Sequence, residues 1–453
     1  MSTPTTHEHY DVIAIGAGPF NLGFAALSDG LPDFSLAVLE ARDSFSWHPG
    51  MMLPGTHLQV PFMADLVTMA DPTNRYSFLN YMKLHGRIYP FYIRENFYAL
   101  RNEYSDYLAW AAEQLPSVKF GHRVMDISYQ NGRYELSVLT DQGLLSFSAT
   151  KLVLGTGSEP YLPDSVTSEA LGSGAVTHSS EYLFRRDQIL AEVPDSQRGK
   201  VVTVLGSGQS AAEIFLDLLR SLPEEDHLVW STRSERYFPL EYTKLTLEMT
   251  SPEYIDHFHA LPMDRRDALS KAQKGLYKGI NADLIDEIHE ELYQRSVHGA
   301  PNVHLRTGSS LLEVRPAGDT LQVTLRHDRT DEEMVFGTDQ LVLATGYRQA
   351  TDEFLKGISE RISYLPDGRF DVDRNYSVGR AQDIFVQNAE LHTHGFTAPD
   401  LGMGAYRNSV LINRLAGREV YPVEERIAFQ KFGAAELEGL PSSILPTTAT
   451  ALD

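Results

Sequence analysis

The chain has 453 residues, among them 39 basic and 61 acidic side chains and no cysteine. This length predicts two or three packed domains, and the formal net charge of −22 disfavours nucleic acid as a partner, because an acidic surface repels phosphate groups. The lack of cysteine excludes disulfides, thiolate catalysis and redox-active cysteine pairs. No apolar run approaches the roughly 20 residues that span a bilayer, and residues 1–9 do not resemble a secretory signal. We therefore expect a cytoplasmic protein that makes no membrane contact.

The first predicted unit is a strand, a glycine turn and a helix, followed by a second strand. The first strand is Asp11–Ile15, and the second ends at Glu40, placed to accept hydrogen bonds from ribose hydroxyls. Gly16 permits a tight turn, and Gly18 lets the backbone approach a pyrophosphate at a helix N-terminus. The alternative is a glycine turn kept for packing alone. The predicted nucleotide-binding residues of this unit are Gly16, Gly18, Pro19, Asn21, Leu22 and Glu40, with Asn21 where a third glycine or alanine is usual.

Residues 200–238 repeat this pattern with a different ending. A strand leads into a second G-x-G turn, and the strand that follows the helix ends at Arg233 instead of an acid. An arginine at this place, with Arg236 close by in the chain, favours the 2′-phosphate of NADPH over the free hydroxyl of NADH. The alternative is that both arginines are solvated loop charges. The predicted residues of this unit are Gly206, Gly208, Gln209, Ser210, Arg233 and Arg236.

Two such units predict an α/β fold with two Rossmann-like dinucleotide-binding domains. The helical periodicity of "INADLIDEIHEELYQRS" adds a small helical region at about 240–300, shared by the substrate site and a subunit interface. We expect an FAD-binding domain over 1–165, an NADPH-binding domain over 166–346, a return segment of the FAD domain with the substrate site over 347–440, and a tail over 441–453. FAD fits the unit that ends in an acid, and NADPH fits the unit that ends in arginine. Without cysteines to relay electrons, dioxygen is the expected acceptor.

The chain resembles the class B flavin monooxygenases, and more narrowly the N-hydroxylating monooxygenases of siderophore biosynthesis. The motifs that carry the resemblance are "GAGPFNLG" (16–23), "WHPGM" (47–51), "LQVPFMADLVTMADPTNRYSFLNYM" (58–82), "GSGQSAAE" (206–213), "ATGY" (344–347) and "HTHG" (392–395).

This resemblance implies a reaction in which NADPH reduces FAD and oxygen adds at flavin C(4a). A neutral primary amine then attacks the hydroperoxyflavin and becomes a hydroxylamine, so that no side chain acts as a nucleophile. The resemblance also implies a homotetramer, because tetramers are common in the family. It places near the cofactors Trp47, His48, Gln59, Thr345, Gly346 and Tyr347.

The segment "LQVPFMADLVTM" (58–69) bears on the substrate. By the resemblance, hydroxylases of lysine or ornithine carry F-L-K-D-L here, and the lysine pairs with the substrate carboxylate, whereas this chain has Ala64 in that place. An asparagine that also contacts the amino acid is replaced by Ser251. Burying a carboxylate without a cation costs several kcal/mol in order of magnitude. We therefore expect an aliphatic diamine, putrescine or cadaverine; the alternative is an amino acid held by Lys244 or Lys278.

A diamine needs an acid for its second ammonium group. The candidates are Glu241, Glu248 and Glu390, and we expect His392 of "HTHG" to line the flavin or substrate pocket. Two histidines without further ligands do not predict a metal site. Two other functions stay open: a flavin monooxygenase that acts on sulfur or ketones, and a non-catalytic NADPH-binding regulator.

Overall fold

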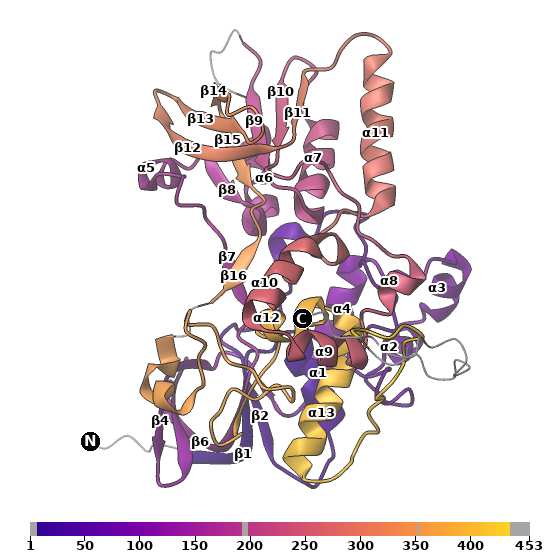
Figure 1. Ribbon diagram of the computed structural model, residues 1–453, viewed down its shortest axis with the longest axis vertical. Coiled ribbons are helices and arrows are strands. Elements are labelled where there is room, and N and C mark those ends of the chain that lie inside the picture. The colour runs from indigo at the N-terminus through magenta and orange to yellow at the C-terminus, as the bar shows by residue number, and fades with distance from the viewer. Residues whose placement is uncertain (1–6, 193–197, 351–352, 435–453) are drawn as a thin grey trace, which may run out of the picture.

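The computed structural model describes residues 7–192, 198–350 and 353–434, which form two lobes stacked along the long axis of the molecule (Figure 1). The first lobe is built on a seven-stranded sheet in the order β3-β2-β1-β6-β5-β4, with β17 also paired to β6. Strands β3, β2, β1, β6 and β17 run parallel, and β4, β5 and β6 form an antiparallel meander. The strands are β1 (His7–Ile15), β2 (Leu36–Leu39), β3 (Val118–Lys119), β4 (Arg123–Gln130), β5 (Arg133–Thr140), β6 (Gly143–Leu154) and β17 (Ile384–Val386).

The predicted first strand is confirmed and begins a few residues earlier than expected, at His7. Its apolar side chains alternate between the two faces of the sheet, because Val12 and Ala14 pack in one core cluster and Ile13 and Ile15 in another. Both faces are therefore covered, as a parallel strand requires. The first cluster lies under α1 (Pro19–Ser28), α4 (Arg101–Gln114) and α13 (Gly404–Ala416), and the second lies under the 3-10 segment η4 (Glu353–Arg361).

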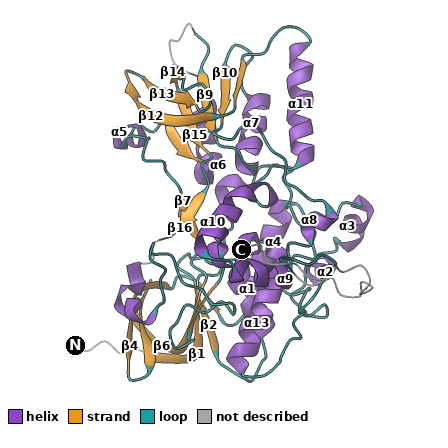
Figure 2. Cartoon of the chain, viewed as in Figure 1, coloured by secondary structure: helices purple, strands orange, loops and turns teal. Residues whose placement is uncertain are grey.

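The second lobe has a five-stranded parallel sheet in the order β11-β10-β9-β15-β8. Helices cover one face, and a three-stranded antiparallel sheet covers the other (Figure 2). The parallel strands are β8 (Val176–His178), β9 (Val201–Leu205), β10 (His227–Ser231), β11 (Val303–Arg306) and β15 (Gln340–Leu343). The covering elements are α6 (Tyr182–Leu190), α7 (Gln209–Ser221) and α11 (Ala282–Ser296) on one side, and β12 (Ser309–Ala317), β13 (Thr320–His327), β14 (Glu333–Thr338) and α5 (Ser168–Gly172) on the other.

The helical region expected at about 240–300 is present and serves both lobes. Helix α11 packs on α7 of the second lobe, whereas α9 (Pro252–Ala260) and α10 (Met263–Ala272) contact α12 (Leu391–His394) of the first lobe. The region also contains α8 (Lys244–Leu247) and the 3-10 turn η3 (Lys274–Leu276). It therefore contacts elements of both lobes.

The main chain crosses between the lobes at the two-stranded antiparallel ladder of β7 (Ser158–Pro160) and β16 (Tyr347–Gln349) (Figure 1). We propose these crossings as the domain boundaries, close to residues 165 and 346 expected from the sequence. The expected tail at 441–453 lies outside the described residues. The remaining elements are α2 (Phe78–Leu84), α3 (Ile88–Arg94) and the short 3-10 turns η1 (Pro49–Met51), η2 (Ser179–Glu181), η5 (Gly395–Thr397) and η6 (Leu401–Met403). In the described ranges, no helix combines the length and apolar character needed to cross a membrane.

Candidate active site

The first glycine turn borders a cavity of about 890 Å³ at the carboxyl ends of β1, β2 and β6. Gly16 has φ +90°, and a Cβ on it would lie 2.4 Å from the carbonyl oxygen of Gly155, so that only glycine fits. Gly18 is the N-cap of α1, with Pro19 as the first helical residue, and a Cβ on Gly18 would meet no protein atom within 4 Å. The open space lies where a pyrophosphate reaches a helix N-terminus.

Glu40 follows the end of β2 and lines the same cavity. One carboxylate oxygen accepts a 2.8 Å hydrogen bond from the amide of Ala17, and the other accepts one of 2.9 Å from the amide of Arg42. These bonds fix the carboxylate beside the glycine turn, and each oxygen keeps a lone pair for a ribose hydroxyl. The cavity thus combines open backbone, a helix N-terminus and an oriented acid, which fits the nucleotide half of FAD.

Asn21 and Leu22 differ from the cofactor contacts expected of them. Asn21 borders the cavity, but its amide nitrogen donates to the carbonyls of Ile15 (3.1 Å) and Gly16 (2.7 Å), and its oxygen accepts from Gln387 at 2.8 Å. The asparagine therefore closes the strand–helix turn, which explains its place at the third position of the motif. Leu22 is fully buried in the core of the first lobe and does not line the cavity, so we no longer propose it as a cofactor contact.

The second glycine turn also contains a position that only glycine can occupy. Gly206 has φ +154°, and a Cβ on it would lie 2.2 Å from the carbonyl oxygen of Ala344. Gly208 is the N-cap of α7, and the next residues, Gln209 and Ser210, line a second cavity of about 340 Å³ that lies between the lobes. The turn and the helix N-terminus again suit a pyrophosphate.

A cluster of cations lies next to this second turn. The carbonyl of Lys278 is 3.4 Å from the position of a Cβ on Gly208. Partial burial lowers the pKa of the Lys278 side chain, and the charges of Lys274 and Arg233 lower it further. An anion such as a 2′-phosphate would relieve the mutual repulsion of these three cations. Lys274 and Lys278 were not expected in this role, because only the folded helical region brings them beside Arg233; Arg236 is exposed and lines neither cavity.

The two cavities meet at five residues that line both of them: Trp47, His48, Tyr347, Pro399 and Leu401. The indole of Trp47 lies 5.6 Å from the ring of Tyr104, and the imidazole of His48 meets Tyr347 edge-on at 6.0 Å. Desolvation by the surrounding protein, followed by the charges of Arg101 and Arg42, lowers the pKa of His48 to about 4, although the residue is exposed at the cavity surface. His48 is therefore neutral near pH 7, and this junction is the expected meeting point of a flavin ring and the substrate.

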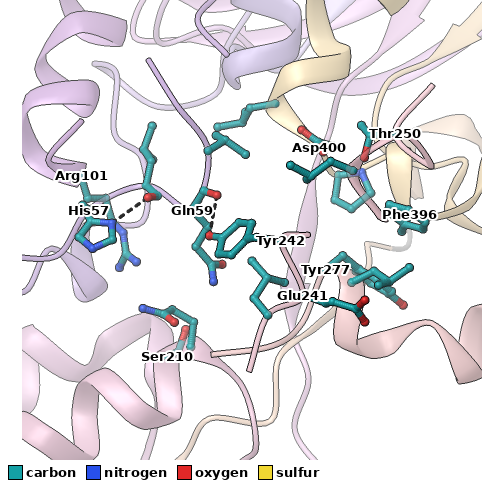
Figure 3. A pocket seen from close by; sticks show the side chains of 18 of the residues that line it. His57, Gln59, Arg101, Ser210, Glu241, Tyr242, Thr250, Tyr277, Phe396 and Asp400 are labelled. Atoms are coloured by element: carbon teal, nitrogen blue, oxygen red, sulfur yellow. Dashed lines mark hydrogen bonds between the residues drawn. The ribbon is translucent and has the colours of Figure 1, made fainter. Parts of the chain in front are cut away.

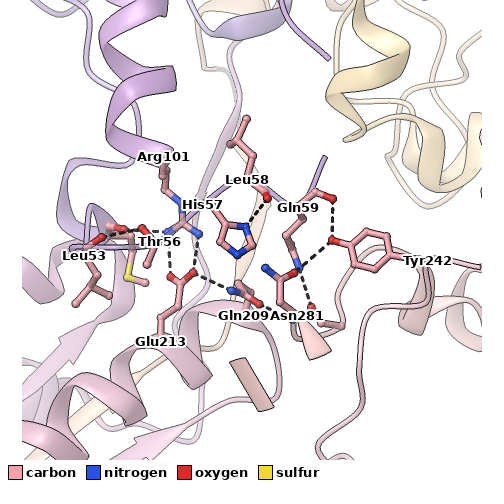
Figure 4. A network of polar contacts seen from close by, with 12 residues as sticks. Leu53, Thr56, His57, Leu58, Gln59, Arg101, Gln209, Glu213, Tyr242 and Asn281 are labelled. Carbon is pink, nitrogen blue, oxygen red and sulfur yellow. Dashed lines mark hydrogen bonds and ion pairs between the residues drawn. The ribbon is translucent and has the colours of Figure 1, made fainter. Parts of the chain in front are cut away.

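A polar network joins the lobes beside the second cavity (Figure 4). Arg101 of α4 makes a two-fold contact with Glu213 of α7, at 2.9 and 2.7 Å. Glu213 accepts a bond from Gln209, whose oxygen accepts from the amide of Asn281. Asn281 in turn accepts a 2.8 Å bond from Gln59. Gln59 is thereby held at the cavity wall, although its interlobe partners had no sequence signal.

The residues of the "ATGY" motif have separate tasks. Tyr347 faces both cavities. Thr345 donates to the carbonyl of Tyr161, and the carbonyl of Gly346 accepts a 3.1 Å bond from His178. Thr345 and Gly346 therefore hold the chain crossing and do not line either cavity.

Of the acids predicted to meet the substrate, Glu241 alone lines the second cavity (Figure 3). Glu248 accepts hydrogen bonds from the amide and the side chain of Gln430. Glu390 is fully buried and paired with Arg407 at 3.1 Å. Neither carboxylate lines the second cavity, and we no longer propose either as the partner of the substrate ammonium.

Two further residues expected in the substrate pocket do not line the second cavity. Ser251 is buried, and its hydroxyl caps α9 by accepting from the amide of Tyr254 at 3.2 Å. The imidazole of His392 donates to the carbonyl of Phe370 at 2.6 Å. Neither side chain lines the second cavity, and neither do Lys244 and Lys278, the alternative carboxylate partners.

Ala64 is buried behind the cavity wall, where its carbonyl accepts from Tyr104 at 3.0 Å. Asp400, which the sequence did not single out, lines the cavity close by (Figure 3). The sequence marks this residue only as the first position of a D-x-G turn, and in the structure it is the N-cap of η6. Among the residues of the described ranges, no group of three or more histidines and acids is arranged to hold a metal ion.

Comparison with known proteins places this architecture in one family. Residues 8–349 match the family described as L-lysine 6-monooxygenase/L-ornithine 5-monooxygenase. A putrescine N-hydroxylase of Shewanella oneidensis is 44% identical over 433 residues, which cover 94% of this chain and 85% of that protein. The crystal structure of DfoA bound to FAD, a cadaverine monooxygenase of desferrioxamine biosynthesis from Erwinia amylovora, is 47% identical with a TM-score of 0.90, and the match covers 94% of this chain and 99% of that chain.

A more distant structure is that of the ornithine N-hydroxylase KtzI from Kutzneria sp. 744, with reduced FAD, NADP⁺ and L-ornithine. It is 28% identical with a TM-score of 0.81, and the match covers 90% of this chain and 99% of that chain. The family match spans most of the chain and includes both glycine turns. The chain therefore belongs to the L-lysine 6-monooxygenase/L-ornithine 5-monooxygenase family, the NADPH-dependent flavin N-monooxygenases of class B.

Proposed function

We propose that this protein uses FAD, NADPH and dioxygen to N-hydroxylate one primary amine of an aliphatic diamine, putrescine or cadaverine, for hydroxamate siderophore biosynthesis. The residue that carries the proposal is Ala64, at the motif position where, by the family resemblance, hydroxylases of amino acids have a lysine for the substrate carboxylate. The names of two relatives, a putrescine N-hydroxylase and a cadaverine monooxygenase, support it. The reaction balances as amine, O₂, NADPH and a proton giving hydroxylamine, water and NADP⁺.

FAD, when bound and reduced by NADPH, supplies the activated oxygen atom. The residues of this chain bind and orient the two cofactors. Gly18 and Glu40 fit the nucleotide half of FAD, and Arg233 with Lys274 and Lys278 fits the 2′-phosphate of NADPH. These assignments rest on the open backbone at Gly18, the oriented carboxylate of Glu40 and the cation cluster beside the second turn.

The substrate cavity must present the reacting amine without its proton, although a free alkylamine has a pKa near 10.4. Where the cavity meets the flavin cavity, its wall is formed by Trp47, Tyr347, Pro399 and Leu401. These side chains exclude water and disfavour a charged amine, because desolvation lowers an amine pKa. Neutral His48 adds no positive charge that would repel the substrate.

The test measures hydroxylamine product, because NADPH consumption alone also reports uncoupled formation of hydrogen peroxide. Cadaverine differs from lysine, and putrescine from ornithine, only by the absence of the carboxylate. We expect hydroxylamine from the two diamines and less than about one hundredth of that kcat/KM from the two amino acids, because an unpaired buried carboxylate costs several kcal/mol.

Product from lysine or ornithine at a kcat/KM equal to that of the diamines would contradict the proposal. Product from none of the four, with peroxide formed at the same rate in each, would favour another class of substrate such as a sulfide or ketone. FAD that neither copurifies nor binds would favour the non-catalytic regulator.

A further inference from the structure

Asp400 lies on the wall of the substrate cavity and does not line the flavin cavity. Its chain neighbours, Pro399 and Leu401, line both cavities, whereas Asp400 lines the substrate cavity (Figure 3). One carboxylate oxygen accepts a 2.7 Å hydrogen bond from the amide of Gly402. This bond fixes the orientation of the side chain.

The carboxylate of Asp400 and the methyl group of Ala64 face the same point. A Cβ on Gly402 would lie 3.1 Å from Oδ1 of Asp400 and 4.0 Å from Cβ of Ala64. Position 64 therefore lies near this carboxylate. By the family resemblance, hydroxylases of amino acids carry a lysine at this position, so this chain has a negative group near the place of that positive one.

Arg407, whose charge acts on Asp400, and Arg101, which also lines the cavity, are already engaged by other acids. Arg407 is fully buried and pairs with Glu390 at 3.1 Å, and Arg101 pairs with Glu213 at 2.7 Å. None of the ion pairs found in the described part of the chain includes Asp400. A partly buried carboxylate without its own cation is costly, and a substrate ammonium would relieve that cost.

We infer that Asp400 binds the second, non-reacting ammonium of the diamine and is a specificity-determining residue; this inference rests on the proposed function. The other acid on the cavity wall is Glu241, which is exposed and accepts a 2.8 Å bond from Thr246. An ion pair in a half-buried position is stronger than one in solvent, so that Asp400 rather than Glu241 discriminates among substrates. Asp400 would also repel a substrate carboxylate.

The experiment compares cadaverine with n-pentylamine, which has the same carbon chain and no second ammonium. The FAD-loaded enzyme and its Asp400→Asn and Glu241→Gln variants are assayed for hydroxylamine, and diamine binding to the oxidised enzyme is measured by calorimetry. We expect Asp400→Asn to raise the KM and Kd of cadaverine at least about tenfold, since a hydrogen bond to a charged group is lost. The values for pentylamine should change less than about twofold. Glu241→Gln serves as the matched control and should leave the ratio of the two amines close to that of the unmodified enzyme.

Each outcome separates this inference from the proposed function. If the unmodified enzyme hydroxylates cadaverine and Asp400→Asn loses discrimination against pentylamine, the inference is supported. If Asp400→Asn keeps the full preference for cadaverine, or if Glu241→Gln is the variant that loses it, the inference is wrong while the proposed function stands. If the unmodified enzyme hydroxylates neither cadaverine nor putrescine, the proposed function itself fails. A loss of activity toward both amines equally would assign Asp400 a structural role and overturn the inference.

Discussion

At the scale of single residues, the two glycines of the first turn have different reasons to be glycine. Gly16 is required by the fold, because its φ of +90° and the nearby carbonyl of Gly155 leave no room for a side chain. Gly18 has an ordinary φ of −72° and open space around it, so that its requirement comes from the bound nucleotide. The sequence motif alone does not separate these two reasons.

This difference predicts distinct phenotypes. Gly16→Ala should destabilise the protein by roughly 1–3 kcal/mol or more, because it places a strained backbone against a clash. Gly18→Ala should leave the thermal unfolding midpoint of the FAD-free protein unchanged and weaken FAD binding at least about tenfold. Thermal unfolding and FAD titration of the two variants measure this. Equal loss of stability in both variants would show that Gly18 is also required by the fold.

Asp400 gives a prediction for pH. Burial raises its pKa, against the opposing effects of the Gly402 amide and the charge of Arg407. Because the pKa of this acid is raised, the carboxylate takes up a proton at a higher pH than an ordinary aspartate does. Protonated Asp400 no longer attracts an ammonium ion. The ratio of kcat/KM for cadaverine over pentylamine should therefore fall as the pH is lowered through that pKa.

Both substrates must lose the proton of the reacting amine, so the effect of pH on that step cancels in the ratio. Asp400→Asn should give a low ratio that does not change with pH, whereas Glu241→Gln should follow the unmodified enzyme. A ratio that is independent of pH in the unmodified enzyme would contradict this assignment.

At the scale of elements, the two strand–glycine turn–helix units were predictable because apolar strand, glycine spacing and helix pattern agree in each. The helix at 282–296 was predictable from its periodicity. The error at Ser251 also has a local cause: Ser-Pro-Glu is a helix start, with serine as the N-cap and proline in the first turn, and the structure uses it so. The antiparallel sheet β12–β14 was not expected, since it contributes no motif to either nucleotide site.

Arg233, which follows β10, and Lys274 of η3 lead to a prediction for coenzyme preference. Arg233→Gln and Lys274→Gln should each raise the KM for NADPH about tenfold or more, because each removes a charge-assisted contact with the 2′-phosphate. The KM for NADH should change little, since NADH has no such phosphate. Lys244→Gln, an exposed lysine of the same helical region, is the matched control. Steady-state oxidation rates of NADPH and NADH test this prediction. Equal changes in the two KM values would contradict the assignment of these cations to the 2′-phosphate.

At the scale of the whole molecule, the active site depends on contacts between segments far apart in the chain. Ala64 and Asp400, which are far apart in the chain, both lie near Gly402 in the loop that precedes α13. Arg101 and Glu213 belong to different lobes and join the two nucleotide units. No local pattern in the sequence reports such contacts, which is why the cofactor motifs were largely predictable while the acid for the second ammonium was not.

We expect the interlobe ion pair to contribute measurably to the free energy of unfolding. Arg101 and Glu213 are 14% and 3% exposed, so that Glu213→Gln leaves a mostly buried cation without its partner and should cost about 3 kcal/mol or more. The pair of Arg348 and Glu159 at the chain crossing is 62% and 41% exposed, and Glu159→Gln should cost less than about 1 kcal/mol. Thermal unfolding of the FAD-loaded variants tests this difference. Similar midpoints for the two variants would mean that the buried pair does not hold the lobes together.

The most direct test of the substrate assignment is a competition in one vessel. The FAD-loaded enzyme receives equal concentrations of cadaverine and lysine with NADPH and oxygen, and mass spectrometry measures the ratio of the two hydroxylamines, which equals the ratio of their kcat/KM values. The account predicts at least about a hundredfold excess of N-hydroxycadaverine, because lysine would bring an unpaired carboxylate next to Asp400 and Ala64. Equal amounts of the two products, or an excess of hydroxylysine, would contradict it.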